Sequence, residues 1–578
     1  MDAIQLSSLD HYFADYITRA EGASCAGLWI AAALTSAVSC RGNVCLDLSA
    51  ASGYSIVPFR AECEDMCVPP LEQWQQQLAD CTSVGQPGDY TPLVLDADSR
   101  LYLHRSWEYE RLVAEGIQAR SAPLSVDETG LAAALDRYFP MAGTGDLQRE
   151  AACAALTRRF TVISGGPGTG KTSTVARILV LLLELTVGDY PIILLAAPTG
   201  KAAMRLKQSI LQSVELLPLS EAVRSAIPQE VATIHRLLGA IPGQSGFHRN
   251  RNNQLPCDVL VVDEASMVDL PLMARLLEAL HVDTRVILLG DRDQLASVEA
   301  GAVLSDICAG SPGNVLPTAD RPAIIQLKKS YRFNDQSGVG RLSRLINDGD
   351  GVGALTLLTS GAYDDICWRP LPATAVFADS FKLAVGEGFA DYARTAEPAA
   401  ALEALGRFRV LAPHREGRNG VVALNRLVES ALFPFQRDCS AHTPLLAVMV
   451  TANNYDLGLY NGDTGVVDAV RSGEGQTVTF LAPDGGLRSL SALRLPPHES
   501  AFALTVHKTQ GSEFDRVLLV LPDQLSDVLT RELLYTAVTR VRTRIEIWGD
   551  ETVFCRAVEQ CIERNSGLAA RIWNGEPL

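Results

Sequence analysis

The stretch that decides the fold is Gly165-Gly-Pro-Gly-Thr-Gly-Lys171-Thr172, between an apolar run at residues 160–163 and a helical pattern at 175–185. Strand, glycine-rich turn and helix in this order are typical of a phosphate-binding P-loop, because glycines let backbone N–H groups close around phosphate oxygens at a positive helix end. In this motif lysine reaches the β- and γ-phosphates and threonine ligates Mg²⁺. We expect this segment to bind ATP through Gly165, Gly166, Pro167, Gly168, Thr169, Gly170, Lys171 and Thr172.

Two carboxylates, Asp263 and Glu264, follow a second apolar run at residues 259–262. Parallel sheets place their ligands at the carboxyl ends of the strands. We expect Asp263, like Thr172, to hold Mg²⁺, and Glu264 to orient the attacking water. Such a pair is weak evidence alone and strong evidence about 90 residues after a P-loop.

Three further side chains are candidates for contact with the γ-phosphate. Gln294 follows the apolar run 286–289, Arg332 lies in Tyr331-Arg-Phe333, and Arg540 ends a predicted helix. Phosphoryl transfer gains from an arginine that approaches across an interface. Each residue alone also fits a polar loop cap or a surface arginine.

Short apolar runs alternate with helical segments, which predicts an α/β fold with parallel sheets. We expect the runs 160–163, 192–197, 259–262 and 286–289 in one sheet and the runs 408–411 and 517–521 in a second, with a helix at 393–405. The predicted domains are a mostly helical unit at 1–125 and α/β units at 126–325 and 326–578. A hairpin pattern at 477–490, with turn residues at 483–486, predicts a small all-β insertion at about 443–497.

The net charge of −17 is unevenly distributed. Residues 1–146 hold 8 arginines, no lysine and 20 acidic residues, whereas the rest is nearly balanced. Because such a segment repels phosphates, we expect residues 1–125 to bind a protein and not DNA, although a merely solvated acidic surface is an open alternative. Trp29, Trp74 and Trp107 are candidate interface anchors or core residues.

The sequence favours a cytoplasmic protein without a membrane segment. Residues 1–20 show no signal-peptide pattern, and the apolar stretch 28–38 is too short to span a bilayer. The chain has 13 cysteines, which we expect to be free thiols. A metal site at Cys63-x3-Cys67 or Cys40-x4-Cys45 is the less favoured alternative.

The order and spacing of eight motifs resemble superfamily 1 helicases over about 390 residues. They are Gly165–Thr172, Ala197-Pro-Thr-Gly-Lys-Ala-Ala203, Thr233-Ile-His-Arg-Leu-Leu-Gly239, Asp263-Glu-Ala-Ser266, Gly290-Asp-Arg-Asp-Gln-Leu295, Tyr331-Arg-Phe333, Thr505-Val-His-Lys-Thr-Gln-Gly-Ser512 and Tyr535–Arg540. Within that superfamily the motif sequences are similar to those of the RecD subunits of RecBCD enzymes (exodeoxyribonuclease V). Asn461-Gly-Asp-Thr-Gly465, Pro92-Leu-Val-Leu95 and Leu101-Tyr-Leu-His104 extend the likeness, with Thr464 standing where an aliphatic residue is expected.

The resemblance implies two RecA-like motor domains, ATP and Mg²⁺ as cofactors, and roles for further residues. Gln148 would contact adenine, and Gln510 and Gly511 would couple nucleotide to DNA. The residues implied to touch single-stranded DNA are Pro198, Thr199, Gly200, Lys201, His235, Thr505, His507 and Lys508. A core position for His235 is the open alternative.

The resemblance also implies partners and an activity. The chain would be a 5′→3′ DNA helicase that works with RecB-like and RecC-like subunits on double-strand ends in recombinational repair. A self-sufficient RecD-like helicase, a regulatory subunit and a nuclease are the alternatives. The short acidic N-terminal region argues against the first, and the intact Lys171, Asp263, Glu264 and Arg540 argue against the second. The third is disfavoured because the sequence shows no carboxylate cluster with a lysine outside the motor motifs.

Overall fold

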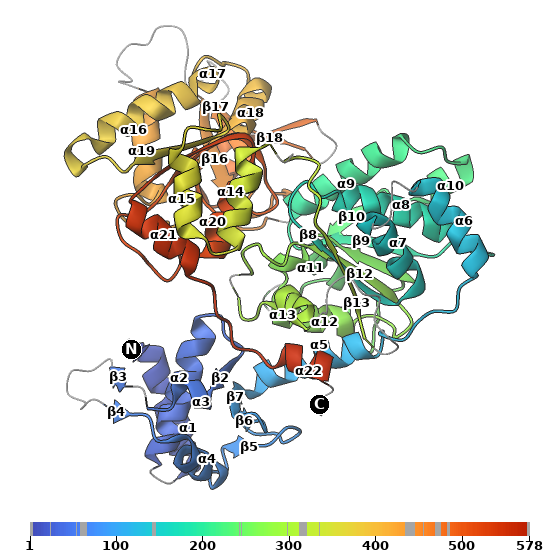
Figure 1. The fold of residues 1–578 in the computed structure, drawn as a ribbon, viewed down its shortest axis with the longest axis vertical. Coiled ribbons are helices and arrows are strands. Elements are labelled where there is room, and N and C mark those ends of the chain that lie inside the picture. The colour runs from blue at the N-terminus through green and yellow to red at the C-terminus, as the bar shows by residue number, and fades with distance from the viewer. Residues whose placement is uncertain are drawn as a thin grey trace.

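The computed structural model describes residues 4–574 (Figure 1). Within that span it leaves out residues 23–24, 54, 58–65, 141–145, 242, 244–245, 298, 311–320, 334–335, 434–444, 455, 469–475 and 483–485. Most of the predicted turn at 483–486, and Cys63 of the alternative metal site, therefore lie outside the described residues. None of the helices in the described ranges is long and apolar enough to cross a membrane.

The first motor domain is built on a six-stranded parallel sheet with the order β10-β9-β11-β12-β8-β13. Its strands are β8 (Phe160–Gly165), β9 (Ile193–Ala197), β10 (Val231–Thr233), β11 (Val259–Val262), β12 (Arg285–Gly290) and β13 (Ala323–Leu327). The four apolar runs expected in one sheet are confirmed as β8, β9, β11 and β12. The helices of this domain are α6 (Glu128–Tyr138), α7 (Leu147–Thr157), α8 (Lys171–Glu184), α9 (Gly200–Glu215), α10 (Glu221–Ala226), α11 (Ile234–Leu238), α12 (Leu270–Glu278) and α13 (Val303–Ala309), with a 3-10 turn η1 (Ala265–Met267).

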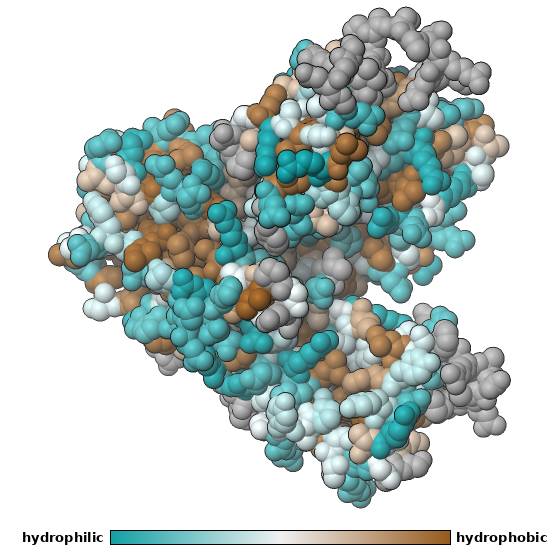
Figure 2. Space-filling view, turned by 180° about the vertical axis from the view of Figure 1, so that it is seen from behind, coloured by the Kyte–Doolittle hydropathy of each residue, from teal (hydrophilic) through white to brown (hydrophobic). Residues whose placement is uncertain are grey.

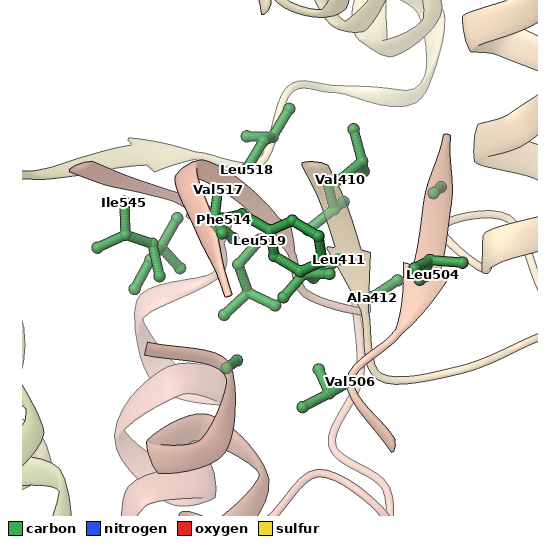
Figure 3. Close-up of a cluster of buried hydrophobic side chains, with 14 of the residues drawn as sticks. Val410, Leu411, Ala412, Leu504, Val506, Phe514, Val517, Leu518, Leu519 and Ile545 are labelled. Atoms are coloured by element: carbon green, nitrogen blue, oxygen red, sulfur yellow. The ribbon is translucent and has the colours of Figure 1, made fainter. Parts of the chain in front are cut away.

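The second motor domain has a five-stranded parallel sheet with the order β14-β23-β22-β15-β21. Its strands are β14 (Ile366–Pro370), β15 (Phe408–Ala412), β21 (Ala503–Thr505), β22 (Phe514–Val520) and β23 (Val541–Gly549). Figure 3 shows the buried aliphatic side chains of β15, β21 and β22 packed together, which fixes the strand ends that carry Thr505 and the residues after it.

Helices cover this second sheet. They are α14 (Gly338–Asn347), α15 (Gly351–Thr359), α16 (Thr374–Gly388), α17 (Ala390–Ala393), α18 (Pro398–Arg407), α19 (Val421–Leu432), α20 (Arg531–Val538) and α21 (Glu551–Glu559), with a 3-10 turn η3 (His507–Thr509). The single helix expected at 393–405 is wrong in part. The chain leaves the helix after Ala393 and starts again at Pro398, because proline is tolerated in the first turn of a helix and not in its interior.

The predicted all-β insertion is confirmed as an antiparallel sheet with the order β19-β18-β17-β16-β20. Its strands are β16 (Leu445–Val450), β17 (Thr464–Asp468), β18 (Thr477–Leu481), β19 (Leu487–Ser491) and β20 (His498–Ser500), with a 3-10 turn η2 (Ala492–Arg494). β18 and β19 form the expected hairpin, with Thr477 opposite Ser491.

The N-terminal region combines helices with two small sheets, β1-β3-β4 and β2-β7-β6-β5. Its helices are α1 (Ser8–Glu21), α2 (Ala26–Cys40), α3 (Leu48–Ala51), α4 (Leu71–Ala79) and α5 (His104–Gln118). Its strands are β1 (Ile4–Gln5), β2 (Cys45–Asp47), β3 (Ser55–Val57), β4 (Met66–Cys67), β5 (Val84–Gly85), β6 (Leu93–Leu95) and β7 (Arg100–Leu103). Helix α5 packs on α12, so this region shares a hydrophobic core with the first motor domain.

The C-terminal segment, residues 560–574, runs from α21 to the junction of the N-terminal region and the first motor domain and ends in α22 (Leu568–Asn574) (Figure 1). We call it the strap. Arg564 donates to the carbonyls of Ser297, Glu299 and Gly301 at 2.6–2.9 Å. Arg571 pairs with the buried Glu110 at 3.0 Å. The strap thus fastens all three parts of the chain together.

Candidate nucleotide and DNA site

The P-loop has the backbone that its glycines predict. Gly168 and Gly170 adopt φ angles of 75° and 84°, in the left-handed region that favours glycine. A Cβ on Gly168 would collide with Cβ of Arg332, and a Cβ on Gly170 would collide with the amide of Gln148. The loop is therefore shaped both by its own backbone and by close neighbours from two other segments.

The Lys171 ammonium lies over the loop. Its Nζ donates to the carbonyls of Gly165 and Gly166, the latter at 3.2 Å. Thr169 Oγ1 donates to the Gly166 carbonyl at 2.8 Å. Helix α8 begins at Lys171, so the N–H groups of its first turn face the loop. This arrangement supplies a lysine and free N–H groups at one place, as phosphate binding requires.

Gln148 lies beside this loop at the start of α7. Its Nε2 donates to the Thr169 carbonyl at 3.2 Å, and Asp146 caps its helix by accepting from the Gln148 N–H at 3.0 Å. The cap fixes where the amide stands. The side chain expected to contact adenine is thus held against the end of the P-loop.

Asp263 and Glu264 stand at the carboxyl end of β11. Glu264 has φ 52°, uncommon for a residue with a side chain, and its N–H donates to Asp263 Oδ1 at 2.9 Å. Burial, and then the Glu264 charge, raise the pKa of Asp263, while Lys171 and Arg205 oppose the rise. Two carboxylates brought together out of water need a cation, and Mg²⁺ takes oxygen ligands of this kind.

Gln294 lies in a network that crosses to the second motor domain. Asp291 Oδ2 accepts from the Gln294 amide and from the Tyr535 hydroxyl, both at 3.0 Å. The Leu295 N–H donates to Thr536 Oγ1 at 2.9 Å. Helix α20, which carries Tyr535 and Thr536, is thereby tied to the loop that follows β12.

Both candidate arginines lie at this cleft. Arg540 is 2% exposed and donates to the carbonyls of Thr536 and Ser512. Burial lowers the pKa of Arg540, and the charges of Glu264 and Asp291 counter that effect.

Arg332 approaches from the segment between the motor domains. The neighbouring Tyr331 N–H donates to the Gly168 carbonyl at 2.7 Å, and Ser330 Oγ donates to the Pro167 carbonyl at 3.3 Å. The segment 330–332 is therefore bonded to the tip of the P-loop, and the structure brings Arg332, Arg540, Lys171, Asp263, Glu264 and Gln294 to one cleft.

A cavity of about 710 Å³ opens beside this cleft, large enough for a nucleotide. Residues on its wall come from the P-loop, from the segment between β13 and α14, from α14 and from α20, including Gly166, Pro167, Thr169, Lys329, Phe333, Arg344 and Tyr535. Phosphate-binding backbone, basic side chains and an aromatic ring share one wall. The residues present therefore fit ATP with Mg²⁺, with Thr172 and Asp263 as the side chains that would hold the metal.

The residues expected to touch a strand from the first motor domain gather where β9 runs into α9. Pro198, Thr199, Gly200 and Lys201 are half-buried, and Thr199 caps α9 by accepting from the Ala202 N–H at 3.2 Å. The ring of Tyr460, in the β insertion, lies so close that a Cβ on Gly200 would be 3.2 Å from it. Burial lowers the pKa of Lys201 to about 8.

His235 is exposed on α11, with its ring centroid 5.9 Å from that of Phe247. The core alternative is wrong. Its element follows β10, the strand beside β9, so its helix starts near the Pro198–Lys201 segment.

The second motor domain contributes Thr505 at the end of β21 and His507 and Lys508 in η3. Lys508 pairs with Glu499 at 2.5 Å, and burial lowers the pKa of His507. Two residues on, Gln510 Nε2 donates to the Leu295 carbonyl at 2.6 Å, across the cleft. Gly511 has φ 69° and packs towards Ala202 of α9.

Three charged residues of the cleft, Glu513, Arg205 and Arg542, were not among the sequence candidates. Glu513 pairs with Arg205, Arg332 and Arg542. Glu513 lies within the stretch Ala501–Phe514, which resembles RecD, but the sequence indicates no role for it, and Arg205 lies on the amphipathic α9 outside the matched motifs. Only the assembled cleft reveals their contact.

Models of known families match three parts of the chain. They are an AAA domain at residues 148–300, the N-terminal domain of the RecBCD enzyme subunit RecD at residues 2–102, and a UvrD-like helicase C-terminal domain at residues 500–545. These matches cover the N-terminal region and parts of both motor domains.

Curated relatives match nearly the whole chain. The RecBCD enzyme subunit RecD of Mycolicibacterium smegmatis is 39% identical over 95% of this chain and 94% of its own length. The corresponding subunit of Haemophilus influenzae is 33% identical, covering 93% and 92%. The ATP-dependent RecD2 DNA helicase of Deinococcus radiodurans is 30% identical over 82% of this chain, which spans 59% of that protein. The chain therefore belongs to the RecD family of RecBCD enzyme subunits, which are superfamily 1 DNA helicases.

Proposed function

We propose that this chain is the ATP-hydrolysing, 5′→3′ translocating subunit of a RecBCD-type enzyme in the cytoplasm. It works with RecB-like and RecC-like subunits on double-strand DNA ends, with the nuclease centre in a partner. The observation that carries the proposal is the hydrogen-bond network across the cleft. Tyr535 of the second motor domain donates to Asp291 of the first at 3.0 Å, and Gln510 donates to the Leu295 carbonyl at 2.6 Å. Arg540 lies just beyond the helix that carries Tyr535, so closure of the cleft can govern hydrolysis.

Each cleft residue has a role that follows from its place. Lys171 and the P-loop N–H groups hold the phosphates. Glu264 orients the attacking water, and Arg332 and Arg540 stabilise charge that develops on the transferred group. Mg²⁺ held by Thr172 and Asp263 would neutralise part of the phosphate charge. Gln148, held against the end of the P-loop by its bond to Thr169, contacts the adenine base.

Strand movement follows from the segment between Thr505 and Gly511. One end carries the groups that face the strand, and the other reaches Leu295 through Gln510. Leu295 adjoins Gln294, the proposed contact of the γ-phosphate. Binding or hydrolysis of ATP therefore moves the DNA-binding residues of the second domain relative to Pro198–Lys201 of the first. Alternation of the two grips moves the protein along one strand.

The N-terminal region is the proposed docking surface for a partner subunit. Leu9, Tyr12 and Tyr16 on α1 are 61–68% exposed, and Figure 2 shows apolar side chains among hydrophilic ones on this region. Trp74 and Trp107 are buried and cannot serve as anchors. Charge substitution at Tyr12 and Tyr16 together should abolish co-purification with the partners while DNA-stimulated ATP hydrolysis stays within a few-fold of normal.

A stand-alone helicase is the second candidate function, favoured by the likeness to the RecD2 helicase. The two differ in assembly. A heterotrimer recovered from a native extract supports the subunit, and a lone, fully active chain supports the alternative.

The decisive test of the motor is ATP hydrolysis stimulated by single-stranded DNA. Lys171→Gln removes the phosphate clamp and Glu264→Gln removes the water-orienting carboxylate, so each should reduce turnover by roughly 10³-fold or more. Direction is read from unwinding of duplexes with a 5′ or a 3′ tail. Near-normal turnover in either variant overturns the site assignment, and unwinding from the 3′ tail overturns the direction.

A further inference from the structure

Glu513, the residue immediately before β22, is a buried carboxylate outside the roles proposed above. Its side chain is 7% exposed and contacts three arginines from three parts of the cleft. Arg332 Nη2 lies 2.6 Å from Oε1, Arg542 Nε lies 3.3 Å from Oε2, and Arg205 of α9 also bonds to Oε1. One acid thus joins the first motor domain, the connecting segment and the second motor domain.

Four arginines crowd the surroundings of Glu513, and Asp515, 3.7 Å from Arg542, is a second carboxylate there. Burial, and then the charges of Arg205, Arg540 and Arg542, lower the pKa of Arg332 to about 10. Arg332 Nη1 is buried without a hydrogen-bond partner. Crowded guanidinium groups favour a further anion, and the phosphates of a bound nucleotide are the anion that the P-loop beside Arg332 is expected to hold.

Arg332 has two binding places within reach. Its Cβ lies against Gly168, in the P-loop, while its guanidinium is held by Glu513. Rotation about the side-chain bonds of Arg332 moves the guanidinium between the carboxylate and the phosphate site without movement of the backbone. Glu513 therefore competes with nucleotide for this arginine.

Glu513 lies a few residues after the proposed DNA-binding residues of the second motor domain. Thr505, His507 and Lys508 precede it in the same segment, and carbonyls of that segment hold two more cleft arginines, Gly511 with Arg205 and Ser512 with Arg540. A displacement at the strand-binding end of this segment reaches Glu513 within a few residues.

We propose that Glu513 is a positioning residue that withholds Arg332 from the nucleotide until a bound DNA strand moves the segment 505–513. This inference rests on the proposed motor function and assigns its DNA dependence to one carboxylate. Removal of the carboxylate frees Arg332, so the protein should bind and hydrolyse ATP more readily without DNA.

The test compares Glu513→Gln with the full-length wild type. We expect about a tenfold rise in DNA-free turnover per KM for ATP, and a fall in DNA stimulation by a similar factor, within the roughly 5–150-fold range of such couplings. Glu513→Asp keeps the negative charge but shortens the reach to Arg332, and should show a smaller rise. Glu403→Gln is the matched control, because Glu403 also bonds an arginine, Arg407 at 2.7 Å, but on the surface.

A double-mutant cycle with Arg332→Gln separates positioning from mere packing. If Glu513 acts through Arg332, the rise in DNA-free turnover should vanish when Arg332 is already absent. A parallel loss of DNA-free and DNA-stimulated turnover in both Glu513 variants, or a rise that persists without Arg332, overturns the inference. A wild type without any DNA stimulation would instead refute the motor function on which the inference rests.

Discussion

Glu110 and Glu513 are both buried next to arginine, but different groups neutralise their charges. Glu110 is fully buried and accepts from Arg571 at 3.0 Å, from Tyr102 at 3.2 Å and from Ser566 and the Gly567 N–H at 3.0 Å. One cation and neutral donors satisfy it. Glu513 instead contacts three arginines, although each cluster holds one buried guanidinium nitrogen without a hydrogen-bond partner, on Arg332 and on Arg571.

The difference separates a structural contact from a working one. At Glu110 one arginine and three neutral donors meet the carboxylate, and these contacts fasten the strap to α5. At Glu513 three arginines meet one carboxylate, and a phosphate that enters the cleft would give Arg332 a second anion. We therefore expect a ligand-dependent contact at Glu513 and a fixed contact at Glu110.

The largest effect that follows is expected from Arg540→Ala. Loss of an arginine that stabilises transferred phosphoryl charge should lower turnover by roughly 10³-fold or more, with nucleotide affinity nearly intact. The measurement is DNA-stimulated turnover beside the affinity for a non-hydrolysed ATP analogue. Arg540 also donates to the carbonyls of Thr536 and Ser512. An equal loss of nucleotide affinity and turnover would therefore mean that Arg540 is mainly structural, as Arg571 is expected to be.

Arg571→Ala should have its effect on stability. It leaves Glu110 buried without a cation, which costs roughly 3–5 kcal/mol for a broken buried pair. We expect a lower melting temperature and earlier proteolytic cleavage in the strap, while KM for ATP changes little. Arg571→Met combined with Glu110→Gln should recover part of the loss. A changed KM for ATP with unchanged stability would contradict a structural role for Glu110 as opposed to a ligand-linked role for Glu513.

The smallest effect concerns Asp306 of α13, beside the strap. Burial raises the pKa of Asp306 to about 7, and Glu110 adds to the rise. The folded state keeps a proton that the unfolded state loses near pH 4, so this group's contribution to stability falls as pH rises from about 4 to 7.

Asp306→Asn removes that dependence. The variant should be more stable than the wild type by roughly 1–2 kcal/mol above pH 7, with the difference vanishing below pH 4, since one pKa unit corresponds to about 1.4 kcal/mol and the group keeps some hydration. Thermal unfolding at pH 4, 6 and 8 measures it. A difference that does not vary with pH would mean that Asp306 does not titrate in this window.

The parts of the fold that could be predicted from sequence are those with strong local patterns. The buried strands β8, β9, β11 and β12 read as apolar runs because helices cover both faces of their sheet. β23 is not among the predicted runs because Arg542-Thr-Arg544 and Glu546 interrupt the continuous apolar pattern that marks a buried strand, although it pairs in the second sheet between β14 and β22.

The candidate site divides in the same way. Gly168 and Lys171 belong to a contiguous motif whose spacing carries the chemistry, so the sequence was sufficient to select them. Glu513 and Arg205 meet across 308 residues, and nothing in either local sequence indicates the other. The strap is likewise invisible in the sequence, because Arg564 and Arg571 look like ordinary surface arginines until their distant partners are in place.

The strap has a consequence for biosynthesis. Glu110 leaves the ribosome 456 residues before Ser566, which at roughly 5–20 residues per second is a delay on the order of half a minute to a minute and a half. For that time the nascent N-terminal region must keep an unpaired acid out of its core or hold it protonated. The Glu110 cluster is therefore completed only after residues 566–571 have been made, long after the rest of the N-terminal region.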